Sequence, residues 1–177
     1  RGVGVGAGFG GRRAACARGL GASAMGVSVT CTLEQCNGCG GWGPGAGFLL
    51  NNEMGDLHGE PGVTDTTGLI GTDANLARPG KRMLSSMTPT IIAKDGKLVA
   101  VVGSPGGRTI INTVLQVVLN LVDSQMGIQD AVNAPRFHHP LLPDELQGEK
   151  DALSPATVPA REARGSKVRP GGQHGTP

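Results

Sequence analysis

The 177-residue sequence is poor in aromatic residues: it has no Tyr, one Trp and three Phe. Aromatic side chains usually supply much of a buried core, so aliphatic residues must supply it here. No apolar run reaches the roughly 18 residues of a membrane-spanning helix, and no basic start followed by an apolar stretch marks a signal peptide. The formal net charge of +2 gives no excess of basic residues that would indicate nucleic-acid binding.

Cysteine is also scarce, and all four cysteines lie in the first quarter of the chain, at positions 16, 31, 36 and 39. Cys36 and Cys39 form a single CxxC pair. A structural zinc needs four ligands, and Cys31 does not have the spacing for a second pair. We therefore predict no metal site and no cofactor. A disulfide in an oxidising compartment stays open.

Glycine is abundant instead, and it divides the chain into parts of different composition. Residues 1–25 are mainly Gly, Ala and Arg with no helical or strand period, which predicts a low-complexity segment without ordered structure. Residues 26–165 carry the periodic apolar pattern of one folded domain, and residues 166–177 form a polar tail. The domain opens with a strand over residues 26–33, whose apolar side chains we expect to be buried on one face: Val27, Val29, Cys31 and Leu33.

The central stretch, residues 79–111, has the pattern loop, strand, turn, strand, glycine loop and helix. Residues 90–93 and 98–102 are short apolar runs, and Asp95-Gly96 between them is a strong hairpin signal. The sequence Gly-Ser-Pro-Gly-Gly at 103–107 ends the second strand. A helix follows whose apolar residues occur nearly all round, so we expect burial on more than one side. Backbone N–H groups of such a loop can bind an anion or an oxyanion, although many glycine loops are only turns.

Two polar pairs are candidates for ligand binding. The hydroxyls of Ser85 and Ser86 could bind a carboxylate, or they could belong to a serine-rich turn. The carboxylates of Glu53 and Asp56 could hold an ammonium group, or they could lie on a solvated acidic turn. The residues alone leave both alternatives open.

Four blocks of sequence resemble one known family: GFLLNNEMGD, PGKRMLSSMTPT, GSPGGRTIINTVLQVVLN and NAPRFHHPLLPDEL. They resemble the small subunit of the γ-glutamyltranspeptidases, in the same order. The resemblance implies an N-terminal nucleophile hydrolase of α+β class, a four-layer αββα sandwich that is incomplete in this chain. It also implies transfer of a γ-glutamyl group from glutathione to water, amino acids or peptides, with the large subunit of the same precursor as partner. Family members are usually exported, so a periplasmic or extracellular location is expected.

The resemblance also assigns roles to residues that match the family's motifs. Thr32 corresponds to the threonine that hydrogen-bonds the nucleophile, and Gly106 and Gly107 to the backbone N–H donors of the oxyanion hole. The serine pair at 85 and 86 would hold the α-carboxylate of the γ-glutamyl donor. The carboxylates of residues 53 and 56 would hold its α-amino group. Glu34 replaces an asparagine that is common in the family's substrate site, which puts that contact in doubt.

The nucleophile is the main departure from the family pattern. The family opens its small subunit with Thr-Thr-His, and counting back from the strand that ends at Thr32 reaches Ala14, Ala15 and Cys16 instead. No threonine precedes Thr30. The sequence therefore predicts part of a γ-glutamyltransferase and glutathione hydrolase that is inactive as it stands. The alternative is a catalytically inactive γ-glutamyl-binding relative or a damaged gene product.

Overall fold

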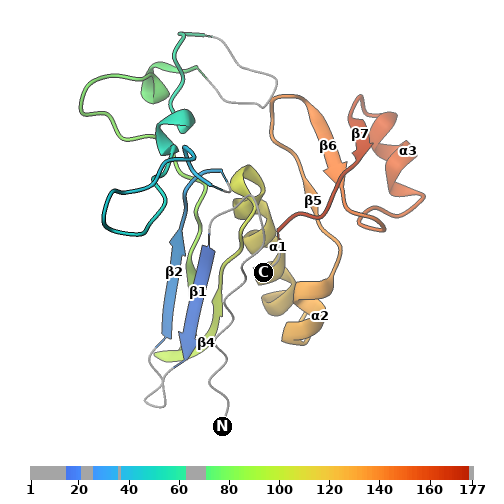
Figure 1. The fold of residues 1–177 in the computed structure, drawn as a ribbon. Helices are drawn as coiled ribbons and strands as arrows, with labels where there is room; N and C mark the ends of the chain where they lie inside the picture. Colours follow the sequence, from blue (N-terminus) through green and yellow to red (C-terminus); the bar gives the residue numbers. More distant parts are fainter. Residues whose placement is uncertain (1–14, 21–25, 36, 63–70, 176–177) are drawn as a thin grey trace.

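The computed structural model describes residues 15–20, 26–35, 37–62 and 71–175, and these form an α+β fold (Figure 1). Its elements follow one another as β1 (Ala15–Leu20), β2 (Gly26–Cys31), the 3-10 turns η1 (Glu53–Asp56) and η2 (Asp73–Asn75), β3 (Thr90–Lys94), β4 (Lys97–Val102), the 3-10 turn η3 (Gly107–Thr109), α1 (Ile110–Val122), α2 (Ile128–Asn133), β5 (Phe137–His138), β6 (Glu145–Gly148), α3 (Thr157–Glu162) and β7 (Lys167–Pro170).

The predicted central hairpin is confirmed. β3 and β4 pair antiparallel, with Thr90 opposite Val102. Asp95 and Gly96 both have positive φ, 51° and 73°, which is the backbone of the tight turn that favours Asp-Gly because both central residues lie in the left-handed region. A register shift between Ile92 and Ala93 marks a bulge in the hairpin.

The core lies between this hairpin and α1. Ala100 and Val102 of β4 pack against the helix residues Ile110, Val114 and Val117, all of them less than one tenth exposed. Each of the Val and Ile side chains contributes about 1.5–3 kcal/mol on burial, so aliphatic residues form the core as the composition predicts. This packing fixes the start of α1, and with it the glycine loop, against the end of β4.

A second two-stranded sheet lies on the other side of the hairpin, so the layers run β1–β2, β3–β4 and α1. Ser28 Oγ donates a hydrogen bond to the carbonyl oxygen of Val102, 3.1 Å away. A Cβ atom added to Gly26 would lie 2.7 Å from Leu98 Cδ2. The two sheets therefore approach closely where β2 presents small residues.

This contact reverses the predicted burial of β2. Val27 is 53% and Val29 42% exposed, and Cys31 is exposed too. The face that packs on β4 carries Gly26 and Ser28 instead. Alternation identified the strand correctly, but the apolar face was assigned to the wrong side, because close sheet packing selects small side chains.

The prediction that α1 is buried on more than one side is also wrong for the described residues. Its buried residues share one face, while four apolar residues on the opposite side are 42–54% exposed: Ile111, Leu115, Leu119 and Val122. Their spacing places them along one stripe of the helix. An apolar stripe shows that a helix can be buried there, but not that this chain supplies the covering layer.

Part of the low-complexity segment has regular structure. β1 pairs antiparallel with β2, with Ala15 opposite Cys31 and Leu20 opposite Gly26, so the expectation of no ordered structure fails for these six residues. The hydrogen bonds between paired strands join backbone N–H and C=O groups. A strand therefore needs no particular side chains to pair with the exposed edge of its neighbour. The rest of residues 1–25 lies outside the described ranges.

The third sheet contains β5, β6 and β7, in that order (Figure 1). β6 pairs antiparallel with β5 and parallel with β7, and α3 lies in the connection between the parallel strands. β7 falls within the predicted polar tail, and His174 beyond it is only 5% exposed, so part of that tail is paired in a sheet or buried. No helix among the described residues has the length and apolarity to span a membrane.

Candidate functional site

The glycine loop leads directly from β4 into η3 and α1. Gly106 has a φ of 148° and Gly107 a φ of 57°, which side-chain-bearing residues rarely adopt. A Cβ atom on Gly106 would lie only 2.5 Å from Thr109 Oγ1. The carbonyl oxygen of Gly106 accepts hydrogen bonds from the Thr109 N–H and hydroxyl, at 3.2 and 2.9 Å. These contacts fix the peptide planes of the loop.

The serine pair lies beside this loop. Ser86 Oγ donates a 2.7 Å hydrogen bond to the carbonyl oxygen of Gly107. The Ser85 hydroxyl accepts a hydrogen bond from the Met87 N–H at 3.2 Å, and Ser85 is exposed. Ser86 thus contacts the glycine loop directly, whereas the hydroxyl of Ser85 holds a turn.

Three carboxylates gather where β2 meets η1. The carboxylate of Glu34 lies over Gly55, such that a Cβ added there would be 2.8 Å from Glu34 Oε2. Gly55 stands between Glu53 and Asp56 in η1. Glu34 itself has a φ of 66°, and its N–H donates to Thr32 Oγ1 at 2.8 Å. The loop after β2 therefore links Thr32 to Glu34, and the carboxylate of Glu34 lies next to the acidic pair Glu53 and Asp56.

The electrostatics of these carboxylates differ. Burial raises the pKa of Glu34, and the negative charges of Asp56 and Glu53 raise it further. Burial also raises the pKa of Asp56, while the guanidinium of Arg108 opposes that rise. Because Arg108 directly follows Gly107, its charge acts between the acidic loop and the glycine loop.

The structure thus places the predicted residues in two groups, and the charge of one further residue acts between these groups. Residues 32, 34, 53 and 56 form the acidic group, residues 86, 106 and 107 form the group at the start of α1, and Arg108 acts between the two. Sequence reasoning missed Arg108. The signal was available, because a cation directly after a Gly-Gly pair lies next to any anion site of that loop.

The strand pairing also shows where two of the residues reached by counting back from Thr32 lie. Ala15, one of the three residues reached by counting back from Thr32, lies opposite Cys31 in β1. Ala14 falls outside the described residues. The pairing brings the start of β1 next to the end of β2, where Thr32 follows.

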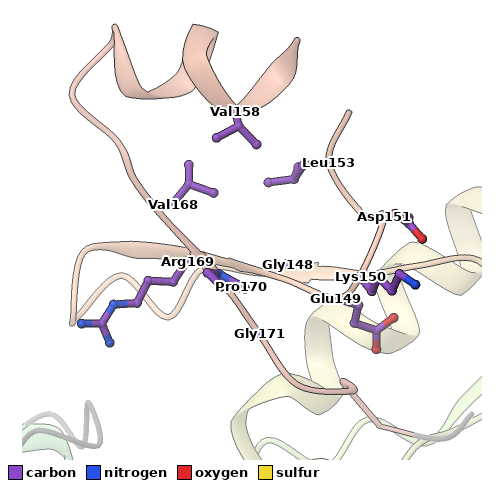
Figure 2. Close-up of a pocket in the computed structure, with 10 residues that line it drawn as sticks. All are labelled: Gly148, Glu149, Lys150, Asp151, Leu153, Val158, Val168, Arg169, Pro170 and Gly171. Carbon is purple, nitrogen blue, oxygen red and sulfur yellow. The ribbon is translucent and has the colours of Figure 1, made fainter. Parts of the chain in front are cut away.

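Two further features contain no predicted site residue: a cavity and a pair of histidines. A cavity of about 400 Å³ lies beneath α3, where Leu153, Val158 and Val168 point toward one another (Figure 2). No predicted site residue lines it. His138 is buried and its Nδ1 lies 2.8 Å from Asn112 Nδ2, while the exposed His139 pairs with Asp144.

Metal ligands do not gather in the described residues, which contain no group of three or more His, Cys, Asp or Glu side chains able to hold a metal ion. Cys31 and Cys39 are free thiols on the surface. Cys36 lies outside the described residues, so the question of a disulfide in an oxidising compartment stays open.

Comparison with known proteins gives one consistent family. The family described as gamma-glutamyltranspeptidase matches residues 19–176. The glutathione hydrolase proenzyme of Escherichia coli (strain K12) is 53% identical over 142 residues, which are 80% of this chain and 24% of that protein. A Pseudomonas sp. (strain A14) protein of the same name is 48% identical over 141 residues, again 80% of this chain and 24% of its own length.

A solved structure agrees with these relatives. The γ-glutamyltranspeptidase of Helicobacter pylori, crystallised as a threonine-to-alanine mutant, superposes with a TM-score of 0.84 at 44% identity, covering 90% of this chain and 86% of that one. This confirms the predicted N-terminal nucleophile hydrolase fold. The chain spans about a quarter of the length of the curated relatives it matches. The chain belongs to the γ-glutamyltranspeptidase family.

Proposed function

We propose that this chain is the part of a γ-glutamyltransferase and glutathione hydrolase that binds the γ-glutamyl head of the donor and holds its γ-carbonyl oxygen. The observation that carries the proposal is the 2.7 Å hydrogen bond from Ser86 Oγ to the carbonyl of Gly107. It joins a hydroxyl suited to the α-carboxylate to a loop suited to an oxyanion. The named activity of the relatives supports the choice of substrate.

Recognition of the head rests on complementary charge. A free γ-glutamyl group carries an α-ammonium and an α-carboxylate. Glu53 and Asp56 would accept hydrogen bonds from the ammonium, and the Ser85 hydroxyl would donate to the carboxylate. Ser86 would donate to it by rotating its hydroxyl away from the Gly107 carbonyl. Arg108, which already acts on Asp56, adds positive charge directly after the glycine pair.

The reaction would develop negative charge on the γ-carbonyl oxygen. The N–H groups of Gly106 and Gly107 would stabilise this charge, and one such donor is typically worth about 3 kcal/mol in the transition state. Thr32 would orient the nucleophile. The attacking threonine is the missing component, since residues 14–16 are Ala-Ala-Cys, so the chain would bind donor without cleaving it.

The half-exposed apolar residues of β2 and α1 support a further layer, which the large subunit would supply. A second candidate function, a γ-glutamyl-binding relative that never had the nucleophile, is supported by the same Ala-Ala-Cys sequence. The DNA upstream distinguishes the two. A Thr-Thr-His codon run in another reading frame favours a damaged enzyme gene, and an uninterrupted frame favours the binding protein.

Ligand binding to the full chain tests the proposal. Ligand-observed NMR should detect binding of L-glutamate, and no binding of N-acetyl-L-glutamate, which lacks the ammonium. Asp56→Asn should weaken L-glutamate binding about tenfold, because hydrogen bonds to charged groups are worth about 1.5–3 kcal/mol. Asp73→Asn is the matched control, since Asp73 lies in the 3-10 turn η2 with its side chain 88% exposed. Equal binding of the two ligands would contradict the proposal.

A further inference from the structure

The segment 171–175, which we name the strap, runs from the end of β7 back to α1 (Figure 1). The strap is anchored through its main chain at His174. The N–H of His174 donates to Glu149 Oε1, and its carbonyl accepts a 3.1 Å hydrogen bond from the buried hydroxyl of Thr113. Arg136 holds Glu149 in turn, at 3.1 Å between Nη2 and Oε1. Both anchors are rigid, since one lies on a helix and the other in a buried ion pair.

The next residue meets the glycine loop from behind. Gly175 is buried with a φ of +71°, and a Cβ atom added to it would overlap Ser104 Oγ and lie 2.6 Å from the carbonyl oxygen of Pro105. Ser104 is fully buried, with an exposure of 0%. The strap therefore touches the two residues that come immediately before Gly106.

From this packing we infer that the strap is a positioning element, and that Gly175 sets the orientation of the Gly106 and Gly107 N–H groups through Ser104 and Pro105. The inference rests on the proposed role of those N–H groups as oxyanion donors. Ser86 and Thr109 hold the two glycine carbonyls from the other side. The strap supplies the opposing contact, so the loop is fixed from both sides.

The contact of residue 175 with Ser104 and Pro105 requires glycine, because no space is left there for a Cβ atom. A Cβ closer than 3.0 Å to backbone atoms forces a shift, and packed interiors transmit such shifts rather than absorbing them. The carbonyl of Pro105 belongs to the same peptide plane as the N–H of Gly106. Displacing that oxygen therefore rotates one of the two proposed donors directly.

The first test compares Gly175→Ala with Gly172→Ala in the full chain. Gly172 lies in the same strap but is exposed, and a Cβ atom added to it would have no neighbour within 4 Å. With the protein labelled with ¹⁵N-glycine, Gly175→Ala should shift the amide resonances of Gly106 and Gly107, and Gly172→Ala should leave them unchanged. A Gly175→Ala variant that keeps both resonances in place overturns the inference.

A second pair of variants tests the anchor without adding a Cβ. Thr113→Val removes the hydroxyl that binds the His174 carbonyl at nearly constant volume, while Thr113→Ser retains it. The valine variant should shift the same two resonances in the same direction, and the serine variant should not. Equal spectra for the two variants would mean that the strap does not position the loop.

Ligand selectivity separates a positioning role from a merely structural one. L-Norvaline has the α-ammonium and α-carboxylate of L-glutamate but a methyl in place of the γ-carboxylate. Gly175→Ala should weaken L-glutamate binding by about tenfold and leave L-norvaline binding unchanged. Equal weakening of both would show a general structural defect and overturn the inference. Failure of the unmodified chain to bind L-glutamate would instead refute the proposed function, while the amide resonances would still decide the role of the strap.

Discussion

The buried ion pair between Arg136 and Glu149 gives the sharpest test of the packing described above. The two side chains are 5% and 11% exposed. The carboxylate of Glu149 accepts hydrogen bonds from the N–H of Arg136 at 2.8 Å, from its Nη2 at 3.1 Å and from the N–H of His174. Truncating Glu149 to Ala would leave a buried guanidinium with only its hydrogen bond to the Val132 carbonyl and no counter-charge, and the N–H groups of Arg136 and His174 without this acceptor.

The expected loss of stability depends on how the lost hydrogen bonds of Glu149 compare with the hydration that its carboxylate gains on unfolding. Three hydrogen bonds to a charged group would sum to about 4.5–9 kcal/mol if they were independent, but unfolding also hydrates the carboxylate. Removal of one partner of a buried pair costs about 3–5 kcal/mol in comparable sites. We expect Glu149→Ala to lower the free energy of unfolding by about 4 kcal/mol, a large share of the roughly 5–15 kcal/mol of a typical domain.

Urea unfolding followed by circular dichroism measures this loss. The matched control is Glu145→Ala in the same strand region, because Glu145 pairs with Arg169 at 3.2 Å but the arginine is 69% exposed. That pair should contribute no more than about 1 kcal/mol. If Glu149→Ala does not fold, Glu149→Gln should show a smaller loss, and the double variant Arg136→Met with Glu149→Leu should recover most of the stability. Equal losses for Glu149→Ala and Glu145→Ala would refute the reasoning.

Three further predictions concern the site. The purified chain should not cleave a γ-glutamyl anilide, and turnover above background that disappears on replacing Cys16 would contradict the missing nucleophile. The raised pKa of Glu34 means that the folded state binds its proton more tightly, so stability falls as pH rises through that pKa. Glu34→Gln should therefore stabilise the chain at pH 7 and be neutral below the ordinary pKa of 4.5, as measured by urea unfolding at both pH values. Gly106→Ala should lower the free energy of unfolding by about 1–3 kcal/mol, because its φ of 148° is strained for alanine; a neutral substitution would show that the loop adapts.

Local sequence signals predicted the elements that carry the site. Asp95-Gly96 fixed the hairpin, because both residues tolerate positive φ, and the apolar runs on either side matched β3 and β4. The glycines after β4 marked the break before α1. The contact between Ser86 and Gly107 then follows from the hairpin, whose two ends lie side by side.

Features set by tertiary context were predicted less well. The burial of β2 was reversed because close sheet packing at Gly26 and Ser28 outweighed the apolar character of Val27 and Val29. The composition identified residues 166–177 only as a polar tail, whereas the structure buries His174 in it through main-chain hydrogen bonds. Backbone contacts of this kind leave no trace in hydropathy.

The strap also has a consequence for the order in which the chain assembles. The β3–β4 hairpin closes over the two residues of its turn, and α1 follows it directly. The hydrogen bond from Thr113 to His174 spans 61 residues, and closing so long a loop costs more chain entropy than closing a hairpin. Contacts between distant residues form more slowly than local ones, so the glycine loop gains its rear support only when residues 171–175 have been made and have returned to α1. Ribosome-bound nascent chains that end before residue 171 should therefore contain the hairpin and helix with a loop that is not yet held in place.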